Sequence, residues 1–165
     1  MILSEILSNE FAHEAKTTRR MLERLPADKL DWRPHAKSFT AIGLASHIVE
    51  CLGWTETILT QDDLDIDPTT YQPYQATSVD GLLERFDDRV AAGQRALASV
   101  KDADLERPWA FKIMGRERWK KPKAAVMRDF TLSHLIHHRG QLSVYLRLLD
   151  VPVPGAYGPT ADDKK

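Results

Sequence analysis

The sequence predicts an all-α fold, a four-helix bundle with one or two long crossover connections. Four long segments place apolar residues at helical spacing, and prolines or capping residues bound most of them. No segment shows a comparably strong alternation of apolar and polar residues, which would indicate a β-strand. Four amphipathic helices in one chain are typical of a bundle, and the connections are longer than simple helical hairpins need.

The first two helices are expected over residues 4–25 and 40–60. The first carries an apolar stripe and ends at Pro26, because proline cannot continue a helix at that point. The second ends in the acidic, turn-rich stretch 62–68. The apolar residues of the two stripes are Leu7, Phe11, Met21, Leu22 and Leu25, followed by Leu44, Ile48, Leu52, Trp54, Ile58 and Leu59.

The last two helices are expected from residue 77 or 78 to about residue 100, and from about residue 122 to about residue 149. Thr77 or Ser78 can cap the third helix, and Pro122 is a favourable first-turn residue for the fourth. Pro152 and Pro154 stop the fourth helix. We therefore assign one bundle domain to residues 1–155 and expect residues 156–165 to form a flexible tail.

Length, charge and cysteine content argue against several classes of protein. A length of 165 residues suits one domain, and a net charge of −1 produces no field that would attract nucleic acid or a membrane surface. The first twenty residues lack the basic and apolar regions of a signal peptide, and no apolar run is long enough to span a bilayer. The only cysteine, Cys51, excludes an internal disulfide and an all-cysteine zinc site. We expect a cytoplasmic protein.

A locally basic stretch precedes the fourth helix, over residues 112–123, with Trp109 and Trp119 beside it. Such a stretch can bind nucleic acid or an anionic small thiol. A solvated loop anchored by its tryptophans is the commoner outcome, and acidic residues elsewhere balance its charge. We therefore do not expect nucleic-acid binding.

Polar side chains interrupt the apolar stripes of three helices. His47 and Cys51 lie on the inward track of the second helix, His134 and His138 on that of the fourth, and Glu14 on that of the first. Buried polar groups cost free energy unless they are hydrogen-bonded, paired or bound to a metal. Their recurrence on three helices predicts a common polar cavity.

Three histidines of this set can bind one divalent transition metal. His134 and His138 are four residues apart, so their imidazoles project from one face of a helix toward the same point. His47 would supply the third ligand and leave positions open to water or substrate. From spacing alone His137 can replace His138, and a hydrogen-bonded histidine core without metal is an open alternative.

Further residues would lie beside these ligands. Glu14 could accept a hydrogen bond, act as a base or bind the metal, but it could equally lie at the bundle edge. Gln141 could orient a histidine N–H or a water molecule. Cys51 is one turn from His47 and thiolate is a good zinc ligand, although a small core cysteine is commoner.

Two stretches of the chain resemble the DinB-like (damage-inducible) family. They are HLIHHRGQLSVYLRLL, residues 134–149, and LERLPADKLDWRPHAKSFTAIGLASHIVE, residues 22–50. The resemblance covers almost the whole chain. It implies a metal, nickel or zinc, bound by His47, His134 and His138, and it implies a homodimer. The wider superfamily includes thiol-dependent transferases and isomerases.

These observations yield three functional hypotheses. The leading one is a metal-dependent transferase that joins a low-molecular-weight thiol to a small electrophilic molecule. The second is a metal-dependent hydrolase, for which added thiol would be unnecessary. The third is a non-catalytic, stress-associated metal-binding bundle, which a fourth protein ligand from Cys51 or Glu14 would favour.

Overall fold

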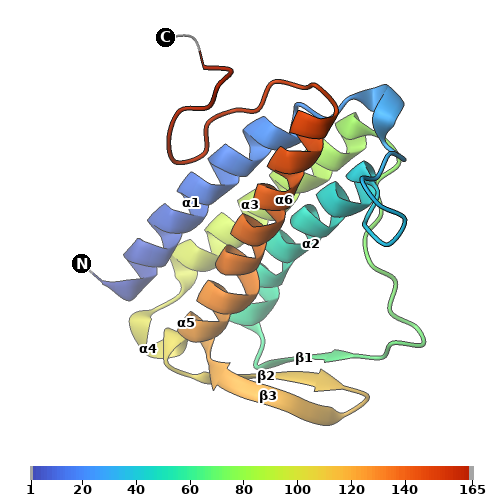
Figure 1. Ribbon diagram of the computed structural model, residues 1–165. Helices are drawn as coiled ribbons and strands as arrows, with labels where there is room; N and C mark the ends of the chain where they lie inside the picture. The colour runs from blue at the N-terminus through green and yellow to red at the C-terminus, as the bar shows by residue number, and fades with distance from the viewer. Residues whose placement is uncertain (1, 164–165) are drawn as a thin grey trace.

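Four long helices form the body of the computed structural model, which describes residues 2–163 (Figure 1). These helices are α1 (Leu3–Leu22), α2 (Ala41–Thr60), α3 (Val79–Ser99) and α6 (His134–Leu148). Short helical elements accompany them: η1 (Ala27–Lys29), α4 (Asp102–Leu105), α5 (Lys123–Val126) and the π-helical segment η2 (Met127–Ser133). The prediction of four long helices is therefore confirmed. The bounds of the first three differ from the prediction by at most three residues, and the stretch predicted as the fourth is divided into α5, η2 and α6.

The helix starts follow local capping chemistry. Thr40 caps α2 by accepting a hydrogen bond from the backbone N–H of Gly43, and Ser78 does the same for α3 from Gly81. The cap of α1 comes instead from a distant residue, because the Asp102 carboxylate accepts hydrogen bonds from the N–H groups of Leu3 and Ser4, each at 2.9 Å. These bonds satisfy donors that a helix leaves without internal partners.

The fourth predicted helix contains a change of helical type. The chain is helical from α5 through η2 into α6, and Figure 1 shows this stretch as one long ribbon. The π-helical geometry of η2 adds about one residue to the turn, and this shifts the face that all later residues present. His134 is the first residue of α6, directly after this segment.

A three-stranded sheet lies at one end of the bundle, and the all-α prediction is wrong in this respect (Figure 1). Its strands are β1 (Asp63–Ile66), β2 (Pro108–Ile113) and β3 (Arg116–Pro122), in the order β1-β2-β3. β1 pairs with β2 in parallel, and β2 pairs with β3 in an antiparallel hairpin. The basic stretch expected to be a loop is thus largely a hairpin strand.

The physical reason for the missed sheet is that its strands carry little sequence pattern. β1 has four residues, and β3 is exposed or half-buried along its whole length, so no apolar face marks it. The parallel pairing joins segments that are separated by the whole of α3. Such pairing depends on tertiary packing rather than on local periodicity.

The core runs along the bundle axis and continues into the sheet end. Phe11, Leu52, Phe86 and Leu142 come from the four long helices and are fully buried, as is Trp109 of β2. No helix within residues 2–163 is long and apolar enough to cross a membrane.

Candidate metal centre

Three histidines from two helices meet in the bundle. His47 lies in the second turn of α2, and His134 and His138 lie in the first two turns of α6. The ring centroids of His47 and His134 are 5.1 Å apart, and that of His138 lies 4.7 Å from each of the other two. The Nε2 atoms of His47 and His134 are 3.3 Å apart. The structure thus brings together the three histidines that the sequence singled out.

Each of the three imidazoles has an acceptor beside it that orients the ring. The Nδ1 atom of His47 lies 3.1 Å from Oε2 of Glu50, and Nδ1 of His138 lies 2.7 Å from Oε1 of Gln141. His134 is hydrogen-bonded to the backbone of Phe130, within the π-helical segment. Acceptors of this kind fix the tautomer and the orientation of a metal-binding histidine.

Glu50 is ionised in this arrangement. Burial by itself would raise the pKa of its carboxyl group, but hydrogen bonds from His47, the Tyr71 hydroxyl and the Tyr74 N–H outweigh burial and lower the pKa. An ionised carboxylate can only accept, so the proton of neutral His47 resides on Nδ1. Nε2 of His47 is then free to bind a cation.

Two of the histidines are held in the uncharged form. Burial, followed by the charges of His138 and His47, lowers the pKa of His134 to about 4. Burial is also the main cause that lowers the pKa of His138, while its hydrogen bond with Gln141 partly opposes the shift. A neutral imidazole is the form that binds a metal, because the ligating nitrogen must carry a lone pair.

Cys51 offers a second possible donor set. Its Sγ atom lies 4.0 Å from Nε2 of His47, and burial raises the pKa of its thiol. Ligand atoms of His47, Cys51 and His134 lie within 4.8 Å of one another, whereas His138 is not part of this group despite its close ring centroid. The His138 side chain must therefore shift before its nitrogen joins the other two. Both donor sets share His47 and His134.

The residues present fit a divalent transition metal. Two nitrogens bound at about 2.0–2.1 Å in tetrahedral geometry are separated by about 3.3 Å, and this matches the Nε2 separation of His47 and His134. Imidazole and thiolate donors suit zinc, and imidazole also suits nickel. The chemistry of the cluster is thus compatible with metal binding.

Aromatic side chains surround the histidines. Phe39 stacks on His47 with 5.8 Å between ring centroids, and its backbone carbonyl accepts a hydrogen bond from Tyr145. Trp54 and Phe130 stack on one another at 4.4 Å, and both lie against His134, at 5.5 and 6.1 Å. These rings cover the cluster with apolar surface and limit the access of water.

Two cavities reach the histidine cluster from different sides. One, of about 380 Å³, is lined by His47 and by residues of α2, the sheet and the segment that follows β1. The other, of about 350 Å³, is lined by His138, Gln141 and Lys37, among others. Phe39, whose ring stacks on His47, lines both cavities.

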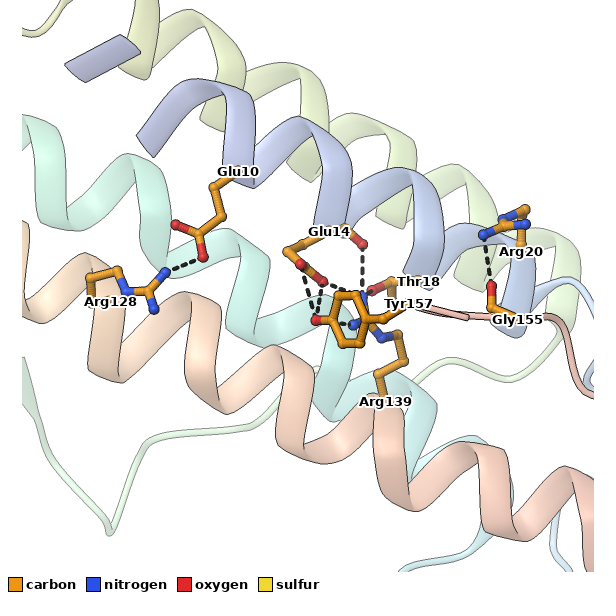
Figure 2. A network of polar contacts seen from close by, with 8 residues as sticks. All are labelled: Glu10, Glu14, Thr18, Arg20, Arg128, Arg139, Gly155 and Tyr157. Carbon is orange, nitrogen blue, oxygen red and sulfur yellow. Dashed lines mark hydrogen bonds and ion pairs between the residues drawn. The ribbon is translucent and has the colours of Figure 1, made fainter. Parts of the chain in front are cut away.

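The structure places Glu14 in a different polar network (Figure 2). Its carboxylate pairs with Arg139 at 2.5 Å and accepts hydrogen bonds from the Tyr157 hydroxyl at 3.0 and 2.9 Å. Arg139 also donates to the side chain of Thr18 and to the Tyr157 hydroxyl. Glu14 and Arg139 are almost fully buried, and the charge of the carboxylate is compensated by the guanidinium of Arg139. Glu14 has no hydrogen bond with the three histidines.

Tyr157 lies in the segment predicted to form a flexible tail, and further tail residues also make contacts. Asp162 pairs with Arg147 of α6, and the Thr160 hydroxyl donates to the carbonyl of Val153. Arg20 donates to the carbonyl of Gly155, as Figure 2 shows. The tail thus contacts α1 through Tyr157 and α6 through Tyr157 and Asp162, and its flexibility in solution stays a prediction.

Glu50 is the principal residue that sequence reasoning missed. It lies three residues after His47 on the same helix, a spacing that allows two side chains to meet. That spacing was a usable signal, as it was for Gln141, three residues after His138. The contacts of Glu50 with Tyr71 and Tyr74 could not be foreseen, because they depend on how the segment after β1 folds back.

Comparisons with known proteins agree with this architecture. A family model described as "DinB family" matches residues 3–165. A Bacillus subtilis (strain 168) protein named "Uncharacterized protein YrdA" is 26% identical over 151 residues, which cover 91% of this chain and 85% of the relative.

Two solved structures share the fold. A DinB-like protein from Bacillus cereus ATCC 10987 has a TM-score of 0.71 at 24% identity, with 93% of this chain and 97% of the other covered. A DinB-like protein from Bacillus subtilis, YjoA, has a TM-score of 0.68 at 21% identity, with 91% and 96% covered. Since the family model spans nearly the whole sequence, the chain belongs to the DinB family.

Proposed function

We propose that this protein is a divalent-metal-dependent transferase that joins a low-molecular-weight thiol to a small electrophilic molecule. The observation that carries the proposal is the cluster of His47, His134 and His138, in which each ring is oriented by an acceptor and two cavities give access. Oriented, neutral imidazoles at the junction of two cavities suit a bound cation with substrate positions left open.

His47, His134 and His138 would hold the ion, which is zinc or nickel in this proposal. A divalent ion at this place supplies Lewis acidity, which favours the anionic form of a thiol or water and polarises an electrophile. The chain supplies the rest. Glu50, Gln141 and the Phe130 backbone fix the rings, and Trp54 with Phe130 keeps bulk water from His134.

The two cavities favour a reaction of two substrates. The cavity beside His138 contains Lys37 and Gln141, which suit a polar, anionic thiol, while the cavity beside His47 is mainly apolar and suits the electrophile. In the transfer the thiol sulfur forms a bond to an electrophilic carbon. The bond from that carbon to its leaving group breaks, the leaving group keeps the bonding pair, and the thiol proton passes to solvent.

A non-catalytic metal site is the second candidate, and the position of Cys51 favours it. If Cys51 and His138 both bound the ion with His47 and His134, four protein ligands would close the site, as in structural zinc sites. A metal-dependent hydrolase would use the same open site without a thiol, with Gln141 rather than Glu14 near the reacting groups.

We also propose that the protein is a homodimer that uses the outer face of α6. Val144 and Leu148 are each 56% exposed on this helix. Among the described residues, nothing lies within 4 Å of the position that a Cβ on Gly140 would take. Close packing inside the subunit therefore does not account for this helical glycine, and an approaching second copy would.

Two measurements test the proposed function together. Elemental analysis of untagged protein should find about one equivalent of zinc or nickel per chain, in line with a single cluster. A screen of small electrophiles should then show turnover that requires both the metal and an added thiol. Turnover that is independent of thiol would favour the hydrolase. Metal that binds tightly without any turnover, in a site that needs Cys51, would favour the structural role.

A further inference from the structure

The cavity of about 380 Å³ beside His47 has an aromatic wall. Its volume lies within the range typical of small-molecule sites. Six aromatic residues line it, and they come from five separate parts of the chain: Phe39, Trp54, Tyr71, Tyr74, Phe111 and Phe130.

The three-stranded sheet forms part of the wall of this cavity. Ile66 of β1 and Phe111 of β2 are lining residues, and Phe111 lies 5.8 Å from Phe130, between ring centroids. Phe39 and Tyr71 are 53% and 42% exposed at the cavity, so large apolar surface faces solvent there. Apolar surface gathered in a hollow marks a binding site more often than scattered exposed residues do.

The charged and titratable groups of the wall are already engaged. The Glu50 carboxylate accepts hydrogen bonds from His47, the Tyr71 hydroxyl and the Tyr74 N–H. The guanidinium of Arg85 lies 5.7 Å from the centroid of the Tyr74 ring and already occupies one aromatic face near the cavity. The ionised Glu50 carboxylate and an ion bound at His47 would have opposite signs and lie close together, so neither a cationic nor an anionic ligand would find an uncompensated partner there in exchange for its lost hydration.

We infer that this cavity is the binding site for a neutral molecule that carries an aromatic ring, and that this molecule is the electrophilic substrate. Aromatic rings of the wall can make stacked and edge-to-face contacts with the ring of such a ligand. Burial of the ligand's apolar surface also makes the free energy of binding more favourable, in proportion to the area buried. The substrate role rests on the proposed metal-dependent transfer, whereas the ligand class rests on the wall alone.

The test compares three fluorinated probes of similar size on the zinc-loaded, full-length protein. The probes are neutral 4-fluoroanisole, cationic (4-fluorophenyl)trimethylammonium and anionic 4-fluorobenzenesulfonate, titrated by fluorine NMR. We expect 4-fluoroanisole to bind about tenfold or more tightly than either charged probe, because only the charged probes lose hydration without compensation. Equal binding of the three, or tighter binding of either charged probe, would overturn the inference.

The location of the probe is tested separately. Nuclear Overhauser contacts should connect 4-fluoroanisole with the indole ring of Trp54. Ile66→Lys, which places a charge in the wall, should weaken 4-fluoroanisole binding about tenfold, while the control Ile6→Lys, at an exposed position of α1 away from the cavity, should leave it unchanged. Absence of the Trp54 contacts, or equal effects of the two lysines, would contradict the assignment.

Repeating the titration on chelated protein separates this inference from the proposed function. If the protein takes up no metal but binds 4-fluoroanisole selectively, the inferred ligand class stands and the proposed transferase function is wrong. If the protein takes up metal and shows thiol-dependent turnover but does not prefer the neutral probe, the transferase proposal stands and the inferred ligand class is wrong.

Discussion

The Glu50 carboxylate connects the metal centre with the aromatic cavity. Its Oε2 atom lies 3.1 Å from Nδ1 of His47, and its Oε1 atom accepts hydrogen bonds from Tyr71 and Tyr74 in the segment after β1. One side chain therefore orients a metal ligand and anchors part of the cavity wall. A ligand that displaces Tyr71 or Tyr74 would disturb His47 through this carboxylate.

The first prediction concerns this orienting role. Glu50→Gln should weaken metal binding about tenfold to a hundredfold, because the charged acceptor that orients the His47 ring and fixes its tautomer is lost. Competition with a chromophoric chelator measures the affinity. Glu56→Gln, on an exposed position of the same helix, is the matched control and should bind like the wild type. Equal affinity of the two variants would show that Glu50 serves only the fold.

The second prediction distinguishes the two donor sets. We expect His138→Ala to lose most of its bound metal and Cys51→Ser to retain it, because Cys51 is a buried thiol whose pKa is raised by burial. Elemental analysis of both variants, with circular dichroism to check folding, measures this. Retention of metal by His138→Ala together with its loss from Cys51→Ser would assign the site to His47, Cys51 and His134.

The third prediction concerns the pH dependence of the metal-free protein. The pKa of His134 is lowered from 6.5 to about 4 by folding, so the unfolded chain binds more protons between these values. The free energy of unfolding should therefore fall as the pH drops from about 7 toward 4.

Urea unfolding at several pH values tests this expectation. The control His35→Gln, at an exposed position, should keep the slope of the wild type, whereas His134→Gln should flatten it. An unchanged slope in His134→Gln would contradict the assigned role of this histidine.

The fourth prediction concerns the buried pair of Glu14 and Arg139 in Figure 2. Arg139→Leu should lower the free energy of unfolding by about 3–5 kcal/mol, because it leaves a buried carboxylate without its counter-charge. The double variant Glu14→Leu/Arg139→Leu should recover most of this loss, since the unpaired charge is then absent. Chemical denaturation measures both.

Metal content provides the check on this assignment. Glu14 has no hydrogen bond with the three histidines, so Glu14→Leu/Arg139→Leu should bind metal as the wild type does. A large loss of metal from a folded double variant would show that Glu14 contributes to metal binding.

The sequence by itself determined the parts of this protein that depend on local periodicity. The four long helices follow from apolar spacing and capping residues, because helical hydrogen bonds join residues four apart. The same spacing placed His134 and His138 on one face of the last helix, and their ring centroids lie 5.1 and 4.7 Å from that of His47. The binding of a metal by these three residues stays a prediction.

Only the tertiary structure decided the features that join distant segments. Glu14 lies on an inward track of α1, yet its partner is Arg139 of α6 together with Tyr157 of the tail. The sheet pairs β1 with β2 across the whole of α3, and the exposed residues of β3 gave no apolar pattern to detect. Interactions of this kind depend on the distance between side chains after folding, and no periodicity in the chain encodes that distance.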